Sequence, residues 1–272
     1  MSTITPVEGV KYFDAHLHRQ DPDLIDAIGP EQKFDGIKAQ VCNGTRPDDW
    51  QAVHDVSSTD ETCVLKAYGV HPWCVDQLPE DWESQLRRFL HSGASSVGEI
   101  GLDHWIQVRD DRLQLEVFER QLQIAHEEDL VPSIHCLRAW GLLVDSIRTG
   151  PALRRGFLVH GFGGSKEVLF QLLDLGGHVS FSSYASDPGR KRMRDAIRAC
   201  PADRLLAETD APDMVPPEDC CQFPLTDTQG KRLHHPLEII SSYAMLADLR
   251  KIPLNELAVQ VEENFRRLFL PG

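Results

Sequence analysis

Short apolar runs alternate with amphipathic stretches along almost the whole chain. Eight of these runs are rich in Val, Ile and Leu and lie between glycine, proline or polar clusters, a pattern typical of strands buried on both faces of a parallel sheet. Any fold for this chain must therefore bury many short strands and leave room for a helix after each one. The runs cover residues 12–18, 36–43, 64–70, 96–101, 131–136, 156–161, 178–182 and 205–209.

The stretches between the runs carry helical periodicity. In residues 110–129, Leu115, Phe118 and Leu122 recur at intervals of three and four and share one face. Ser165 is a predicted N-cap for the next such stretch. Strand–helix alternation repeated eight times predicts an α/β fold of the TIM (β/α)₈ barrel type, with an open doubly wound sheet as the alternative. The predicted helices cover residues 82–90, 110–129, 165–175, 187–199 and 236–249.

The composition indicates a globular enzyme-sized protein rather than one that coats a polyanion. The 272 residues include 28 Lys+Arg and 42 Asp+Glu, and the resulting net charge of −14 argues against bulk attraction to nucleic acid or anionic membrane. The seven cysteines show no Cys-x-x-Cys spacing, which favours a reducing compartment. Without a visible secretory leader or membrane span, we expect a cytoplasmic protein with a single barrel domain over residues 1–272, and no obligatory protein partner is indicated.

Metal-ligating residue types gather at the ends of the predicted strands. His16 and His18 lie two residues apart in the first strand, so both side chains project from the same face and can bind one metal. Glu99 lies in an apolar strand, where an ionised carboxylate needs a partner. Because the carboxyl ends of barrel strands meet on one face, we expect these side chains to converge with those of the later strands. The later strand ends carry His135, His160, Glu208 and Asp210.

Six nitrogen and oxygen ligands, four histidines and two carboxylates, exceed the needs of one structural metal and suit two divalent ions. Such a pair can clamp the attacking and leaving oxygens of a displacement and activate water near neutral pH, so hydrolysis is the expected reaction class. The donor set fits Zn, Mg, Mn, Ni or Fe without choosing among them. The chain has no P-loop, no dinucleotide-binding glycine motif after a strand and no Gly-x-Ser-x-Gly elbow, which weighs against the corresponding chemistries.

Seven ordered motifs resemble those of the TatD family of metal-dependent hydrolases, whose members are often deoxyribonucleases. The resemblance runs through the chain from end to end. The matching segments are FDAHLH (13–18), GVHP (69–72), GEIGLD (98–103), IHC (134–136), HGFGGS (160–165), ETDAP (208–212) and NFRRLF (264–269).

The resemblance implies a TIM barrel with a dinuclear site at the carboxyl ends of the strands. His16 and His18 match ligands of one metal, and Glu99 matches a carboxylate that bridges both metals. His135 and His160 match ligands of the second metal.

Three further positions receive roles from the same resemblance. Asp210 matches a ligand of the first metal that is also the expected general base, so Asp210 and Glu99 are the implied catalytic residues. His71 matches a substrate-binding position. Glu208 is expected to support the site rather than to bind metal.

The chain departs from the family pattern in the segments expected to face the substrate. Arg138 is displaced by one residue from the usual arginine, and His160 is followed by Gly-Phe-Gly-Gly instead of Cys-Phe-Ser-Gly. In the proline-rich segment 211–235, His234 and His235 stand before Pro236 where the family often has Asn-Glu. These departures leave the role of Arg138, His234 and His235 open.

The function that these observations favour is a phosphodiesterase or deoxyribonuclease, 3′–5′ exonuclease-like on DNA, using water activated by two metals. The expected partners are DNA ends or small phosphodiesters. An amidohydrolase acting on a C–N, lactone or carboxylic ester bond is one alternative, and a non-catalytic metal-binding scaffold is another. A basic run at residues 190–194 and the tryptophans Trp50, Trp73, Trp105 and Trp140 after strands two to five are further candidates for contact with a phosphate backbone or a base.

Overall fold

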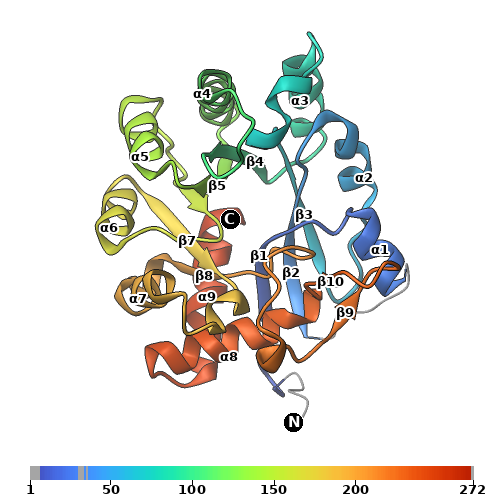
Figure 1. The fold of residues 1–272 in the computed structure, drawn as a ribbon, viewed down its shortest axis with the longest axis vertical. Coiled ribbons are helices and arrows are strands. Elements are labelled where there is room, and N and C mark those ends of the chain that lie inside the picture. Colours follow the sequence, from blue (N-terminus) through green and yellow to red (C-terminus); the bar gives the residue numbers. More distant parts are fainter. Residues whose placement is uncertain (1–6, 30–33, 35, 271–272) are drawn as a thin grey trace.

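Eight parallel strands form one sheet whose spatial order follows the chain, β1 to β8, in the computed structural model of the protein (Figure 1). The structure describes residues 7–29, 34 and 36–270. A doubly wound sheet would place later strands on both sides of the first, so this order confirms the predicted barrel. The strands are β1 Tyr12–Leu17, β2 Ile37–Asn43, β3 Cys63–Tyr68, β4 Ser96–Asp103, β5 Val131–Leu137, β6 Phe157–Val159, β7 Gly177–Phe181 and β8 Leu205–Ala207.

Backbone hydrogen bonds join the two ends of this strand order. The Asp210 N–H donates to the His16 carbonyl at 2.9 Å, and the His18 N–H donates to the Ala211 carbonyl at 2.7 Å. The segment that follows β8 therefore runs beside β1. This contact brings Asp210 next to the two histidines of β1, although almost 200 residues separate them in the sequence.

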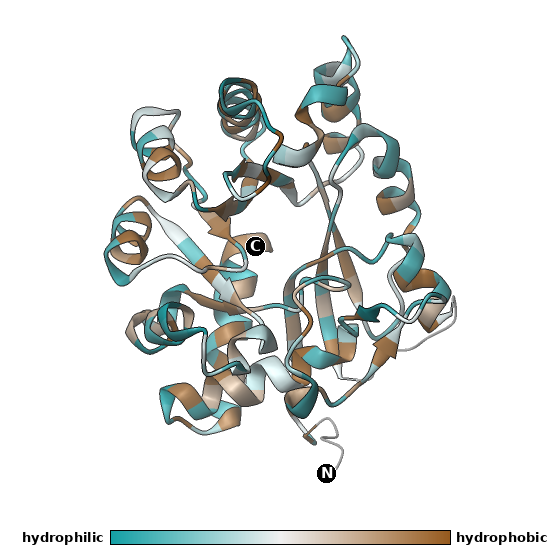
Figure 2. Ribbon diagram, in the orientation of Figure 1, coloured by the Kyte–Doolittle hydropathy of each residue, from teal (hydrophilic) through white to brown (hydrophobic). Residues whose placement is uncertain are grey.

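Helices surround the strands. Their hydrophilic residues predominate on the outer side of the molecule, and their apolar residues pack toward the strands (Figure 2). A short antiparallel pair, β9 Leu225–Thr226 and β10 Arg232–Leu233, lies within the segment after β8. The helices are α1 Pro22–Ile28, α2 Trp50–Asp55, α3 Trp82–Leu90, α4 Asp111–Glu127, α5 Trp140–Thr149, α6 Lys166–Asp174, α7 Lys191–Ala199, α8 Ile239–Arg250 and α9 Leu254–Phe269.

The predicted helices are present with small changes at their ends. The Ser165 hydroxyl accepts from the Val168 N–H and caps α6 as expected. The stretch 187–199 forms a helix only from Lys191, because the Asp187 carboxylate accepts from the Gly189 N–H and holds a turn there. The stretch 236–249 opens with a 3₁₀ turn, Pro236–Glu238, before α8 begins.

Helix α9, which the sequence analysis did not single out, packs against the amino-terminal ends of β1 and β8. The Asn264 side-chain amide donates to the Leu205 carbonyl at 2.8 Å and to the Ala202 carbonyl at 2.7 Å. The ring of Phe265 lies 5.1 Å from that of Phe13 in β1. The helix thereby covers the end of the barrel opposite to the carboxyl ends of the strands.

The cysteines and the hydropathy of the helices bear on two of the expectations from composition. All seven cysteines are free thiols. Among residues 7–29, 34 and 36–270, no helix has the length and apolar character that crossing a membrane requires.

The contact of α9 with β1 makes a stability prediction. Replacement Phe265→Ala removes a fully buried ring and should lower the free energy of unfolding by about 3–5 kcal/mol. Val259→Ala on the exposed side of the same helix is the matched control and should change it by no more than about 0.5 kcal/mol. Urea unfolding followed by circular dichroism measures both. Equal effects of the two variants would contradict the role assigned to α9.

Candidate metal centre

Four histidines and two carboxylates predicted from the sequence meet at the carboxyl ends of the strands. His16 and His18 come from β1 and the residue after it, and Glu99 comes from β4. All are buried except His135, whose exposure is intermediate. The remaining members are His135 in β5, His160 directly after β6 and Asp210 shortly after β8.

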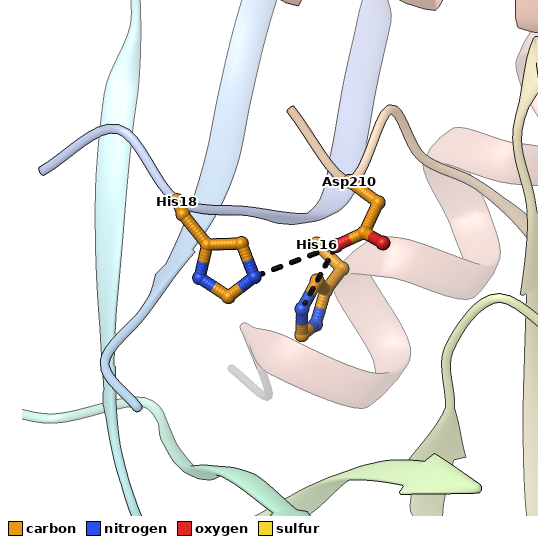
Figure 3. Close-up of side chains that lie close together, drawn as sticks. All are labelled: His16, His18 and Asp210. Carbon is orange, nitrogen blue, oxygen red and sulfur yellow. Dashed lines mark ion pairs between the residues drawn. The ribbon is translucent and has the colours of Figure 1, made fainter. Parts of the chain in front are cut away.

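The first group consists of His16, His18 and Asp210 (Figure 3). Both imidazoles direct Nε2 at the same carboxylate oxygen, Asp210 Oδ1, at 3.5 Å from His16 and 3.4 Å from His18. The three candidate donor atoms lie within 4.8 Å of one another, a spacing at which one cation can contact all of them.

The two carboxylate oxygens of Glu99 face two different sets of histidines. Its Oε2 lies 3.4 Å from His16 Nε2 and 3.3 Å from His18 Nε2, on the side of the first group. Its Oε1 lies 2.7 Å from His160 Nε2 and 3.1 Å from His135 Nδ1. One buried carboxylate therefore faces both sets, which is the arrangement required of a bridging ligand.

Hydrogen bonds to the other ring nitrogens fix which nitrogen of each imidazole can bind metal. His18 Nδ1 lies 2.9 Å from the Asn43 carbonyl, an acceptor only, so Nδ1 carries the proton and Nε2 presents its lone pair to the site. His135 Nε2 lies 3.1 Å from Asp103 Oδ2, so its Nδ1 is the free donor atom. Both histidines are thus oriented as ligands.

His71 has the opposite orientation. Its Nδ1 accepts from the Trp73 N–H at 3.2 Å, and burial lowers the pKa of the ring to about 3, so the neutral ring carries its proton on Nε2. That Nε2–H points at Glu99 Oε1, 3.4 Å away. The distances among His71, Glu99 and His135 would also allow a cation, but this proton position makes His71 a hydrogen-bond donor.

The electrostatics of the cluster fit a divalent cation. Burial alone would lower the pKa of His18, yet the carboxylates of Asp210 and Glu99 raise it well above its usual value. Burial opposes a charge on Glu99 as well, but the surrounding imidazoles, His160 foremost, hold the pKa of that carboxyl well below its usual range. His16 Nε2 is buried and lacks a hydrogen-bond partner among the described residues. Without a cation, His18 therefore holds a proton on the nitrogen that faces these carboxylates. A cation between these groups would replace that proton and balance the ionised carboxylates.

Asp103 supports the site and was missed by the sequence analysis. Its Oδ2 accepts from the Trp73 indole N–H at 2.8 Å as well as contacting His135, and its Oδ1 accepts from the Trp105 N–H at 2.6 Å. Asp103 stands four residues after Glu99 in β4, and this even spacing on one strand is the signal that could have identified it.

Glu208 lies beside the cluster and bonds to groups around His160. It accepts from the Gly161 N–H at 2.6 Å and from the Ser180 hydroxyl, and burial raises the pKa of its carboxyl to about 8. It belongs to none of the groups within metal-binding distance among the described residues. Glu208 therefore fixes the backbone directly after His160.

The two histidines at the end of the segment after β8 stabilise that segment. His234 Nδ1 contacts the Asp213 carbonyl at 3.0 Å, and its Nε2 contacts the Ser183 hydroxyl at 3.2 Å. His235 Nδ1 accepts from the Leu237 N–H at 2.9 Å and caps the turn before α8. The structure thus places both imidazoles in local contacts rather than in the metal cluster.

A cavity of about 1340 Å³ opens above the cluster. Trp73 and Trp105, each about half exposed, line it, whereas Trp50 is fully buried and Trp140 packs on Phe162. Arg190 and Tyr184 also line the cavity, and the guanidinium of Arg190 lies over the Tyr184 ring, 4.0 Å from its centre. Its basic lining residues are Arg46, Arg138, Arg190, Lys191 and Arg192, and its acidic ones outside the cluster are Asp21, Asp48, Asp49 and Asp213.

Comparison with known proteins places these features in a family. The model of the family described as TatD related DNase matches residues 13–270. The chain is 31% identical over 263 residues to YcfH of Escherichia coli strain K12, named an uncharacterized metal-dependent hydrolase, with 97% of this chain and 92% of the relative covered. It is 26% identical to TatD of Pantoea ananatis, named a 3′–5′ ssDNA/RNA exonuclease, with 86% and 88% covered.

A solved structure has the same fold. The crystal structure of YjjV, a TatD homologue from Escherichia coli K12, superimposes with a TM-score of 0.82 at 24% identity and covers 96% of this chain and 98% of its own. The family model and the relatives confirm the resemblance that the seven motifs indicated.

The shared carboxylate predicts how metal binding responds to single substitutions. The wild-type protein should bind about two divalent ions, one for each oxygen of Glu99. Glu99→Gln should weaken both sites, whereas Asp210→Asn should weaken only the one that includes His16 and His18. Asp103→Asn should weaken only the site of His135, by about 10–100-fold.

Zinc titration calorimetry measures these affinities and stoichiometries. Asp111→Asn, which alters an exposed carboxylate of α4 that pairs with Arg109, is the control and should bind like the wild type. If Glu99→Gln weakened only one of the two sites and left the affinity of the other unchanged, this carboxylate would not be shared.

Proposed function

Because this chain belongs to the TatD related DNase family of metal-dependent hydrolases, we propose that it hydrolyses phosphodiester bonds at the 3′ ends of single-stranded DNA. The observation that carries the proposal is the position of Glu99, whose two oxygens face two sets of donors within one cavity. His16, His18 and Asp210 would hold one divalent cation, and His135 and His160 the other, with Glu99 between them.

The cations, when bound, supply Lewis acidity toward a phosphoryl group and toward water. Asp210 is the base that we assign to the attacking water. Its contacts with His16 and His18 both use Oδ1, so Oδ2 is available as a proton acceptor. Burial opposes its charge, but His18 and the other neighbouring imidazoles lower the pKa of Asp210, so the carboxylate is ionised and ready to accept a proton at neutral pH.

His71 positions the substrate in this mechanism. Its Nε2–H is directed into the site by the bond between Nδ1 and the Trp73 N–H, and it lines the cavity beside Glu99. A neutral imidazole that already carries its proton on the inner nitrogen can donate to a phosphate oxygen without a change of protonation state.

The cavity lining favours a short single strand as substrate. Exposed arginine and lysine side chains at the opening of α7 can contact phosphates, and the exposed indoles of Trp73 and Trp105 offer stacking surfaces that accept any base. The net charge of −14 disfavours a long duplex, whose binding needs an extended positive surface.

The proposed reaction can be tested with the metal-reconstituted full chain on end-labelled oligonucleotides. We expect stepwise shortening of single-stranded DNA from the 3′ end and loss of activity with EDTA. Asp210→Asn should reduce kcat by about 100- to 10,000-fold, the usual contribution of a general base. Asp227→Asn, in the loop between β9 and β10, is the control and should retain activity.

Parallel assays on lactones, cyclic amides and small phosphodiesters separate the alternatives. Cleavage of a lactone or amide without cleavage of any phosphodiester would favour the amidohydrolase reaction. Two bound metals with no turnover on any substrate would favour the scaffold. DNA hydrolysis that persists both with EDTA and in Asp210→Asn would refute the mechanism.

Trp105 provides a test of base stacking that leaves the metal site intact. Its backbone N–H, not its indole, contacts Asp103, so Trp105→Ala preserves that bond. The substitution should raise KM for an oligonucleotide about 5- to 150-fold, which corresponds to about 1–3 kcal/mol per stacked base. It should leave hydrolysis of a small phosphodiester without bases unchanged, and Trp105→Phe should restore most of the affinity. An equal loss on both substrates would contradict stacking.

A further inference from the structure

A second basic cavity lies at the opposite end of the barrel from the metal centre. It has a volume of about 220 Å³ and lies between the loop after α5, the start of β7, the turn Ala202–Arg204 before β8, and α9. Each of these segments precedes a strand or packs on strand beginnings, whereas the metal cluster follows the strands. The lining residues are Leu153, Arg154, Arg155, Gly156, Gly176, His178, Arg204, Arg267 and Leu268.

The charge of this cavity is unusual for the chain. All four charged lining residues are arginines, and no carboxylate lines the cavity within the described part of a chain whose net charge is −14. Arg154 and Arg155 contact the carboxylate and the carbonyl of Asp129. Arg155 also donates to the Leu268 carbonyl at 3.2 Å, and Arg267 donates to the Asn264 amide oxygen. Arg204 has only a loose contact of 3.8 Å with Asp203. The guanidinium groups thus retain donors that these contacts do not use.

His178 supplies a second, independent observation. Its side chain is only 4% exposed, and neither ring nitrogen has a hydrogen-bond partner among the described residues. Burial, reinforced by the charges of Arg204 and Arg267, lowers the pKa of the ring to about 4, so the ring is neutral at physiological pH. A buried imidazole without partners is costly unless something else bonds to it.

We propose that this cavity binds a phosphate group, either free phosphate or the phosphate of a monoester, through Arg204, Arg267 and His178. Arginine guanidinium groups bind phosphate oxygens in pairs of parallel hydrogen bonds, and a neutral imidazole can donate its one N–H to the same anion. The volume exceeds the ~30 Å³ of one water several-fold, so an anion of this size fits. A bound phosphate would connect β7, the approach to β8 and α9.

Calorimetric titration of the EDTA-treated full chain with inorganic phosphate tests the proposal, because binding through cations at the other end of the barrel is then absent. We expect one site in the wild type and affinity about 10-fold weaker or worse in Arg204→Gln and in Arg267→Gln. Arg112→Gln removes an exposed arginine of α4 that does not line the cavity, and it should bind like the wild type. No binding by the wild type, or equal losses in all three variants, would overturn the proposal.

His178→Phe distinguishes a ligand site from a purely structural histidine. The substitution keeps a ring of similar shape but removes both unpartnered nitrogens, so it should weaken phosphate binding and raise the thermal midpoint of the ligand-free protein. Unchanged phosphate affinity in this variant would exclude His178 from the site.

A parallel titration with a nucleoside 5′-monophosphate identifies the source of the phosphate. Tighter binding than that of inorganic phosphate, lost in Arg267→Gln, would indicate a monoester ligand, and equal or weaker binding would indicate free phosphate.

Discussion

Glu99 is the residue on which the whole site depends. It is 3% exposed, yet its carboxylate is ionised because five imidazoles lie around it. One oxygen faces the histidines of β1 and the other faces His135 and His160. Without this charge, the clustered imidazoles, of which His16 and His160 stack with ring centres 3.7 Å apart, would have no anionic group shared between the two sets. Because the strands of the barrel end around Glu99, its carboxylate contacts the histidines of β1 and those at the ends of β5 and β6.

The barrel achieves this convergence through contacts that are distant in sequence. The hydrogen bonds between the segment after β8 and β1 place Asp210 beside His16 and His18. The Asn43 carbonyl at the end of β2 and Asp103 at the end of β4 bond to the outer ring nitrogens of His18 and His135, so that the other nitrogen of each ring faces inward. His71 is held the other way by the Trp73 N–H and presents a proton. Side chains of one residue type thus have different roles because different backbone and carboxylate groups lie behind them.

The sequence predicts most of the strands and the residues at their ends, because both depend on local patterns. Apolar runs with glycine and proline boundaries locate the strands to within a few residues, and polar side chains at the ends of such runs are conspicuous. The Trp73–Asp103–His135 contact could not be predicted in this way, because it joins three segments that meet only in the closed barrel. The same holds for the packing of α9 under β1 and for the basic cavity around His178. Local pattern identifies the donors, whereas tertiary packing decides which nitrogen is free and which helix covers which end.

The central claim, that one carboxylate is shared by two cations, has a direct spectroscopic test. Manganese bound on both sides of Glu99 should give the electron paramagnetic resonance spectrum of a magnetically coupled pair, because a bridging carboxylate transmits exchange between the two ions. The coupling should disappear in Glu99→Gln while Asp111→Asn retains it. A spectrum of isolated, uncoupled manganese ions in the fully loaded wild-type protein would contradict the account.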